Sequence, residues 1–388
     1  MKKHMLVAAL SFPILGMTLG TSAQPYDSIV GDAGTLETPD AHWFSVKGDD
    51  IAYLVDGDAG RVRGTLTLSM FTPAIEPDVE NNRIYSYGSF YTRTYYGDRT
   101  DVVLIYDLES TIPVKEVEIP PKSAGIGHPG MIGLVDSRFL GVWNITPAMS
   151  VSLVDTQNDT FLSEISTPGC AGVYPVESGF LMACADGRIQ YIVLDDAGAE
   201  VDRVRSESFF TIDADPVFDY AVRSADGWLF VSLEGQVYDV SVNDGAVEVT
   251  AGWNINPEDE EGATDLNGVP IPADDSWRIG GRQPFAYNAE HELLVTLMHE
   301  GGGQETFEDM GTQIWAFSAA TGRRAYVLEL EEEVHAGSVM LTGDDEPLLL
   351  ISTDNDGELL IYDALTSRLL NRVPELGGSW GATIQRLR

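Results

Sequence analysis

The residues with the clearest chemistry in this sequence are its two cysteines, Cys170 and Cys184. They lie near the two ends of residues 168–187, where apolar runs bounded by turn residues predict a β-hairpin. Antiparallel neighbours bring Cα atoms within reach of a disulfide, and a cysteine pair in an exported chain usually forms one. Zinc or haem would need further ligands nearby, and the sequence offers none there. We therefore expect a disulfide between these two residues.

No other pattern is typical of catalysis or metal binding. The sequence contains no nucleophile elbow, phosphate loop, dinucleotide fingerprint or HExxH motif. The acid pairs Asp274-Asp275 and Asp344-Asp345 occur in polar, turn-like segments where carboxylates stay ionised. None of the histidines has the i, i+4 or short strand spacing of a metal site. They are His4, His42, His128, His291, His299 and His335. We therefore expect neither a catalytic residue nor a metal site in this chain.

The elements that position these residues follow from an internal repeat. One hairpin pattern recurs seven times: an apolar strand with aromatic or β-branched residues, a polar turn, and a second strand. The copies lie at 51–66, 102–119, 151–165, 189–204, 236–250, 313–330 and 359–373. Most are roughly 40–50 residues apart, the spacing of one four-stranded propeller blade. A two-sheet sandwich is the alternative, but it would not produce seven similar units.

The repeats predict an all-β fold, a single seven-bladed β-propeller over residues 24–388. Within it, we expect an N-terminal arm at 24–48 and an inserted acidic loop at 254–280, rich in Asp, Glu, Pro and Gly. Closing the sheets into a ring leaves the loops on two faces free to bind, so function should lie on a face.

The N-terminus predicts export. Lys2 and Lys3 precede a mainly apolar stretch, 5–19, which ends in Thr21-Ser22-Ala23. This pattern indicates a signal peptide, residues 1–23, cleaved after Ala23. A membrane anchor is the alternative, but the stretch is shorter than the roughly 20 residues that span a bilayer, and no later segment approaches that length.

The charge balance excludes two kinds of partner. With 61 acidic and 23 basic residues, the formal net charge is −38, so nucleic acid and anionic membrane surfaces repel the chain. Acidic clusters at 258–261, 329–333 and 344–346 could steer a cationic partner, although solvated loops explain them more simply. A salt-rich habitat would select the same bias without any partner.

Several segments resemble the heavy (large) subunit of quinoprotein amine dehydrogenases, the aromatic (aralkyl) amine and methylamine dehydrogenase heavy chains. The most specific is the run Arg93, Gly97, Arg99, Thr100 and Asp101, which leads into a strand. The other similar segments are 117–122, 144–155, the two cysteines and 277–288. Two departures are Thr146 for a serine and Ile279 for a proline. Around 43–50 no residue matches the family's phenylalanine that shapes the substrate passage.

The resemblance implies a periplasmic complex of two heavy and two cysteine-rich light subunits. The light subunit would carry the cofactor tryptophan tryptophylquinone, oxidise primary amines to aldehydes plus ammonia, and pass electrons to a blue-copper protein such as azurin or amicyanin. This chain, with two cysteines, would be the non-catalytic scaffold that shapes substrate access. The alternative is a stand-alone periplasmic propeller that acts as a binding module or a hydrolase.

The candidate interface with the light subunit starts from Arg93, Arg99 and Asp101. They lie in the loop-like run 92–101, where arginine and tyrosine side chains form the kind of cluster enriched at interfaces. Residues from Trp277 through Gly280 and Gly281 provide a second candidate contact on the same face. An Arg99–Asp101 ion pair that only braces a blade corner is the alternative.

Overall fold

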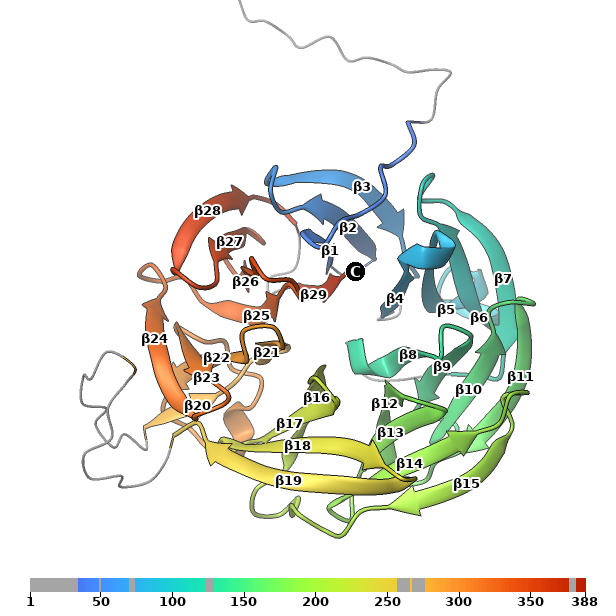
Figure 1. Ribbon diagram of the computed structural model, residues 1–388. Helices are drawn as coiled ribbons and strands as arrows, with labels where there is room; N and C mark the ends of the chain where they lie inside the picture. The colour runs from blue at the N-terminus through green and yellow to red at the C-terminus, as the bar shows by residue number, and fades with distance from the viewer. Residues whose placement is uncertain are drawn as a thin grey trace, which may run out of the picture. The chain divides into compact units, whose positions relative to one another are not determined.

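The computed structural model describes residues 34–48, 50–69, 74–122, 129–256, 266, 276–376 and 382–388. Seven antiparallel sheets are arranged in a ring about a common central axis (Figure 1). The prediction of an all-β, seven-bladed β-propeller is therefore confirmed. The expected signal peptide, 1–23, lies outside the described residues.

Each sheet is one blade, and its strands follow one another from the centre of the ring to its outer edge. We number the blades one to seven from the blade that contains β1. In that order the innermost strands are β29 (Thr383–Arg386), β4 (Ile75–Asp78), β8 (Ile132–Val135), β12 (Cys170–Val176), β16 (Val217–Arg223), β20 (Trp277–Ile279) with β21 (Phe285–Asn288), and β25 (Ala336–Leu341). The second strands are β1 (Trp43–Lys47), β5 (Arg83–Arg93), β9 (Phe139–Asn144), β13 (Gly179–Cys184), β17 (Gly227–Ser232), β22 (Leu293–Glu300) and β26 (Leu348–Thr353).

The outer half of each blade is a hairpin. The third strands are β2 (Ile51–Asp56), β6 (Tyr96–Asp107), β10 (Ser150–Asp155), β14 (Arg188–Leu194), β18 (Gln236–Asn243), β23 (Gln313–Ser318) and β27 (Leu359–Asp363). The outermost strands are β3 (Arg61–Thr67), β7 (Pro113–Ile119), β11 (Thr160–Ser166), β15 (Glu200–Arg205), β19 (Ala246–Asn254), β24 (Arg323–Glu329) and β28 (Arg368–Val373). The described residues also form three 3-10 turns: η1 (Val79–Asn81), η2 (Pro129–Met131) and η3 (Gln304–Thr306).

The seven sequence repeats are these seven outer hairpins. Each third strand is apolar because it lies between the blade's own strands and is packed on both faces, as the fully buried β10 shows. Each outermost strand is largely exposed, as in β11, and accepts the polar residues of the repeat. Turn residues such as Asp159 and Gly198 adopt the positive φ that these connections require.

The ring closes between the two ends of the chain. The last strand, β29, pairs with β1 and so becomes the innermost strand of the first blade. Gln283 supports this closure from another blade, because its side-chain amide donates to the Ile384 carbonyl oxygen and its oxygen accepts from the Ile384 N–H.

The predicted N-terminal arm and the predicted acidic loop both end in residues that form strands. The last residues of the 24–48 arm form β1, and all five residues of this strand are buried in the closing blade. Trp277–Ile279, expected at the end of the 254–280 loop, form β20 and pair with β22. Most of the remaining insertion, 257–265 and 267–275, lies outside the described residues.

The hydrophobic core is divided among the interfaces between blades. Between the fourth and fifth sheets, for example, Tyr174 packs edge-on against Phe230 with ring centroids 5.1 Å apart. Trp228 lies 5.2 Å from the same tyrosine ring. Aromatic pairs of this kind contribute about 0.5–1.5 kcal/mol beyond their buried area. Among the described residues, no helix has the length and hydropathy needed to cross a membrane.

Candidate functional site

The β5–β6 hairpin carries the residues that the sequence singles out, and it is longer than its counterparts in the other blades. β5 has 11 residues and β6 has 12, and a short turn at Thr94, with φ of 65°, connects them. The prediction that 92–101 is a loop is therefore wrong for most of this run. Its aromatic and β-branched side chains continue the ladder and pair across it.

Arg99 and Asp101 form an internal ion pair on this hairpin. Two residues apart on β6, they point to the same side of the strand. Arg99 Nε donates to Asp101 Oδ2 at 2.7 Å, Nη2 donates to Oδ1 at 2.6 Å, and Nη2 also donates to the Lys122 carbonyl oxygen. Ser89 donates a further hydrogen bond to the buried Asp101 carboxylate. Hydrogen bonding to Asp101 raises the pKa of Arg99. These contacts support the alternative that the pair braces the blade.

The outer end of the hairpin presents a different surface. Phe90, Tyr95 and Tyr96 are 44%, 63% and 63% exposed. The Arg93 guanidinium lies over the Tyr96 ring, 5.7 Å from its centroid, because the two residues are cross-strand partners. In the part of the chain that the structure describes, Arg93 forms no ion pair. We call Phe90, Arg93, Tyr95 and Tyr96 the aromatic tip. Exposed aromatic and arginine side chains are typical of interface hot spots.

Sequence reasoning missed Lys122, which lies beneath this hairpin. Its side chain is buried, and Nζ lies 3.6 Å from the centroid of the Tyr87 ring. Burial lowers the pKa of Lys122 to about 7, although Asp101 acts in the opposite direction. The sequence carries no signal for this placement, because Lys122 belongs to the connection between blades.

Trp277, Gly280 and Gly281 lie on another blade, separate from the aromatic tip. Trp277 is half-buried and packs against Trp315, with ring centroids 5.8 Å apart. A Cβ on Gly280 would come within 2.5 Å of the Asp309 carbonyl oxygen, so the close packing there requires glycine. Gly281 donates its N–H to the Phe307 carbonyl oxygen and has a φ of 113°. The two candidate contacts therefore lie on different blades, but Trp277 pairs with Glu300 at the end of β22 that leads to the third strand, the same end of the ring as the aromatic tip.

Gly281 also borders a cavity of about 340 Å³ that three blades share. Trp143, Phe218 and Phe307 form much of its apolar wall, and Asp219 and Glu308 add carboxylates. No local pattern in the sequence indicates this cavity, since its residues come from segments far apart in the chain.

The predicted disulfide between Cys170 and Cys184 is present. The two residues are direct cross-strand partners on β12 and β13, with Cα atoms 4.0 Å apart. The Trp143 indole N–H donates to the Cys170 carbonyl oxygen, so the disulfide also connects to the neighbouring blade.

Three of the four described histidines have polar partners, whereas His299 is buried and its Nε2 has no hydrogen-bond partner among the described residues. His42 lies between Asp58 and Asp344, at 2.7 and 2.8 Å. His335 contacts Asp354, and His291 contacts the Asp345 carbonyl oxygen. His128 lies outside the described residues. Among the residues that the structure describes, no group of three or more His, Cys, Asp or Glu side chains could hold a metal ion.

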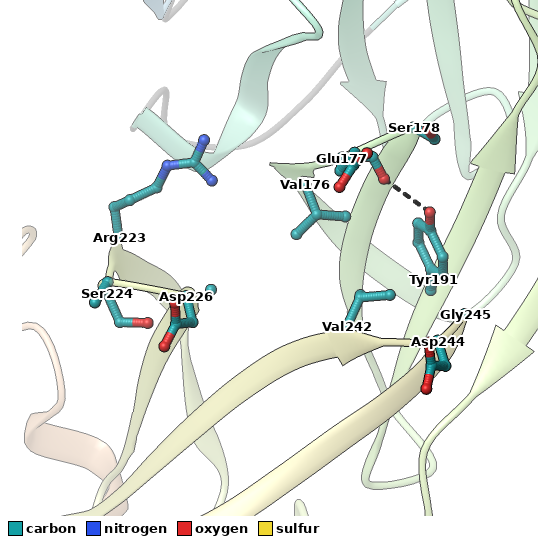
Figure 2. Close-up of a pocket in the computed structure, with 12 residues that line it drawn as sticks. Val176, Glu177, Ser178, Tyr191, Arg223, Ser224, Asp226, Val242, Asp244 and Gly245 are labelled. Atoms are coloured by element: carbon teal, nitrogen blue, oxygen red, sulfur yellow. Dashed lines mark hydrogen bonds between the residues drawn. The ribbon is translucent and has the colours of Figure 1, made fainter.

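At the other end of the ring, a cavity of about 580 Å³ opens between the fourth and fifth blades (Figure 2). Its walls include first-to-second and third-to-fourth strand turns, which lie opposite the second-to-third turn that carries the aromatic tip. Tyr191 donates a 2.8 Å hydrogen bond to the Glu177 carbonyl oxygen on its wall. Asp226, Asp244 and Arg223 also line it.

The sequence matches a family of known proteins over most of its length. A family model described as methylamine dehydrogenase heavy chain matches residues 32–385. The methylamine dehydrogenase heavy chain of Paracoccus versutus is 27% identical over 336 residues, which cover 84% of this chain and 73% of that protein. The corresponding protein of Methylophilus methylotrophus is 22% identical over 338 residues, 84% of this chain and 77% of that protein.

Solved structures support the fold alone. The periplasmic gluconolactonase of Pseudomonas aeruginosa superimposes with a TM-score of 0.56 at 14% identity, covering 89% of this chain and 99% of that one. The β-propeller domain of Myceliophteria thermophila Cps50 gives the same TM-score at 12% identity, covering 87% and 98%.

Proposed function

Because the chain belongs to the methylamine dehydrogenase heavy chain family, we propose that it is the heavy, non-catalytic subunit of an amine dehydrogenase that oxidises primary amines to aldehydes and ammonia. The observation that carries this proposal is the family match over 32–385, which includes nearly the whole propeller. The complex would contain two heavy and two light subunits and reside in the periplasm.

We assign the cofactor tryptophan tryptophylquinone to the light subunit. The residues of this chain do not fit a resident quinone: Trp277 and Trp315 lie together, but as a packing contact of a hydrophobic core cluster. Both cysteines form one disulfide, unlike the many expected of a light subunit. When bound, the cofactor would supply the amine oxidation. Electrons would pass to a blue-copper protein such as azurin or amicyanin.

This chain would contribute a rigid docking face. The aromatic tip offers exposed apolar area and the Arg93 guanidinium, and the Arg99–Asp101 pair holds the hairpin that carries it. The 340 Å³ cavity, with its apolar wall of Trp143, Phe218 and Phe307, would lie under the partner and help exclude water from the reaction. Binding elements on a stable scaffold are the usual arrangement in propellers.

The test is to purify the native complex through a tag on this chain and to record its absorption spectrum before and after adding methylamine and then tyramine. A small, cysteine-rich partner and a quinone absorption that an amine changes are expected, while this chain alone stays colourless. If the chain purifies alone and amine oxidation stays in other fractions, the alternative of a stand-alone periplasmic propeller acting as a binding module or hydrolase holds.

A further inference from the structure

A third cavity, of about 190 Å³, lies among the innermost strands of several blades. Its polar lining consists of the side chains of Glu76, Arg223 and Gln385, contributed by β4, β16 and β29. The rest of its lining is mostly apolar or glycine: Pro129, Gly130, Ile132, Gly133, Leu134, Val173, Pro175, Ala221 and Trp228. A small polar cluster within an apolar wall is the usual composition of a small-molecule site.

Arg223 is held in place but keeps free hydrogen-bond donors. Its guanidinium stacks over the Trp228 ring, 5.2 Å from the centroid, and Nη1 donates to the Pro175 carbonyl oxygen at 2.7 Å. Within the described ranges, Nε and Nη2 have no hydrogen-bond partner and no carboxylate lies at ion-pair distance. Two contacts therefore fix its orientation while the remaining N–H groups are available.

The guanidinium is also separated from the acidic residues of the adjoining 580 Å³ cavity, which it borders too. In Figure 2 its side chain extends away from Asp226 and Asp244. In a chain with 61 acidic and 23 basic residues, an arginine without a paired carboxylate is a local positive site.

The nearest acid in the cavity does not neutralise this charge. Glu76 is enclosed by the surrounding strands, with part of its surface reachable from the cavity. Burial raises the pKa of Glu76 to about 8, against the opposing effects of Gln385, the Leu134 backbone N–H and Arg223. At neutral pH it is mainly the uncharged acid, which can donate a hydrogen bond. Gln385 Nε2 donates a 3.3 Å hydrogen bond to Glu76 Oε2, and the second N–H of this amide is a further donor.

We propose that this cavity binds a small organic monocarboxylate with an apolar tail, with its carboxylate on Arg223 and its tail against Leu134, Val173 and Trp228. The planar guanidinium matches a carboxylate in two parallel hydrogen bonds. Glu76 and Gln385 supply donors beside it, and the apolar wall disfavours ions without a hydrocarbon part, such as phosphate. The volume limits the ligand to a fragment-sized molecule.

The test is to titrate the full chain with phenylacetate, its neutral analogue phenylacetamide, and inorganic phosphate at neutral pH and fixed ionic strength, using calorimetry and the fluorescence of the tryptophans. Phenylacetate is expected to bind at least tenfold more tightly than the amide or phosphate. Equal binding of the amide would show that Arg223 recognises no charge. Phosphate binding as tight as phenylacetate would show that no apolar subsite exists. Either result, or no binding of phenylacetate, overturns the proposal.

Substitutions of single residues test whether Arg223 binds the carboxylate. Arg223→Gln should weaken phenylacetate binding at least tenfold, and Glu76→Gln, which keeps an uncharged donor, should leave it within about threefold. Arg61→Gln, on the exposed outer strand β3, is the matched control and should not change it. Unchanged affinity in Arg223→Gln, or a loss as large in Arg61→Gln, contradicts the assignment. If Arg223→Gln does not fold, Arg223→Lys and the comparison of ligands on the unaltered chain still decide the question. These binding measurements do not depend on amine oxidation, so their failure would leave the proposed subunit role untouched.

Discussion

Arg99 and Asp101 form two hydrogen bonds, of 2.7 and 2.6 Å, along one side of β6, and this pair holds the hairpin from which the aromatic tip projects. Arg93, six residues earlier, has no such internal partner in the described chain and stacks on Tyr96 at the surface. The two arginines of one sequence motif therefore have separable roles, which single substitutions can distinguish.

Arg99→Ala should destabilise the isolated propeller by about 1–3 kcal/mol, because it leaves the buried Asp101 carboxylate with only Ser89 among its side-chain donors. Arg99→Lys should be intermediate, since lysine keeps the charge but not the paired geometry. Urea denaturation of the isolated chain measures both. A free energy of unfolding that stays the same in Arg99→Ala would show that the pair does not brace the blade.

Replacing Arg93 and Tyr96 together by Ala should weaken light-subunit binding by about 2 kcal/mol or more if the aromatic tip is a hot spot. Stability of the isolated chain should change by less than about 0.5 kcal/mol, as for most surface substitutions. Ile112→Ala, which removes a similarly exposed side chain (56%) at the other end of the same blade, is the control. Calorimetry measures the affinity of each variant for the light subunit. An equal loss of affinity in the double variant and the control, or no loss in the double variant, argues against docking at the tip.

The disulfide should stabilise the propeller by roughly 3 kcal/mol in the loop-entropy model, because its cysteines are 14 residues apart. The Cys170→Ser, Cys184→Ser double variant should therefore unfold at lower urea concentration. Thiol titration of the unfolded, unreduced chain should detect no free thiol. Two titratable thiols there would refute the prediction.

His42 should make stability depend on pH near neutrality. Burial opposes its protonation, but hydrogen bonding to Asp58 and the charges of Asp344 and Asp58 outweigh burial and raise its pKa above 6.5. The stabilisation is therefore fully present below about pH 6.5 and lost as pH rises through the higher folded-state pKa. A partly exposed pair of this kind contributes up to about 1 kcal/mol.

His42→Gln should lower Tm at pH 5.5 more than at pH 8.5. The raised pKa of Glu76 also lowers stability as pH rises, but it does so in both the unaltered chain and the His42→Gln variant, so the difference between their Tm values does not contain it. An equal loss of Tm at both pH values would contradict the prediction.

The net charge of −38 should act mainly through repulsion within the folded chain. Added salt screens exposed like charges, so the Tm at neutral pH should rise between low millimolar and physiological ionic strength. Differential scanning fluorimetry in sodium chloride measures this. A Tm that falls over that range would show that self-repulsion is not the dominant effect.

The sequence by itself determined the propeller and the disulfide, because both depend on local patterns. In the outer hairpins, the strands show either alternating apolar and polar residues or a short apolar run, and turn residues follow. Each of the seven copies can therefore be recognised without its neighbours. Cys170 and Cys184 are the two ends of a short inner hairpin, β12–β13, so their pairing is also local in sequence. The Arg99–Asp101 pair is equally local, since residues two apart on a strand share a side.

The tertiary structure alone decided what closes the ring and what lies inside it. Whether 92–101 is loop or strand depended on pairing across a hairpin whose length no local signal sets. The pairing of β29 with β1 joins the two ends of the chain. The cavity that unites Glu76, Arg223 and Gln385 exists only because that closure places three innermost strands around one space. Contacts between residues hundreds of positions apart depend on how all the blades pack together, and no periodicity in a single strand encodes them.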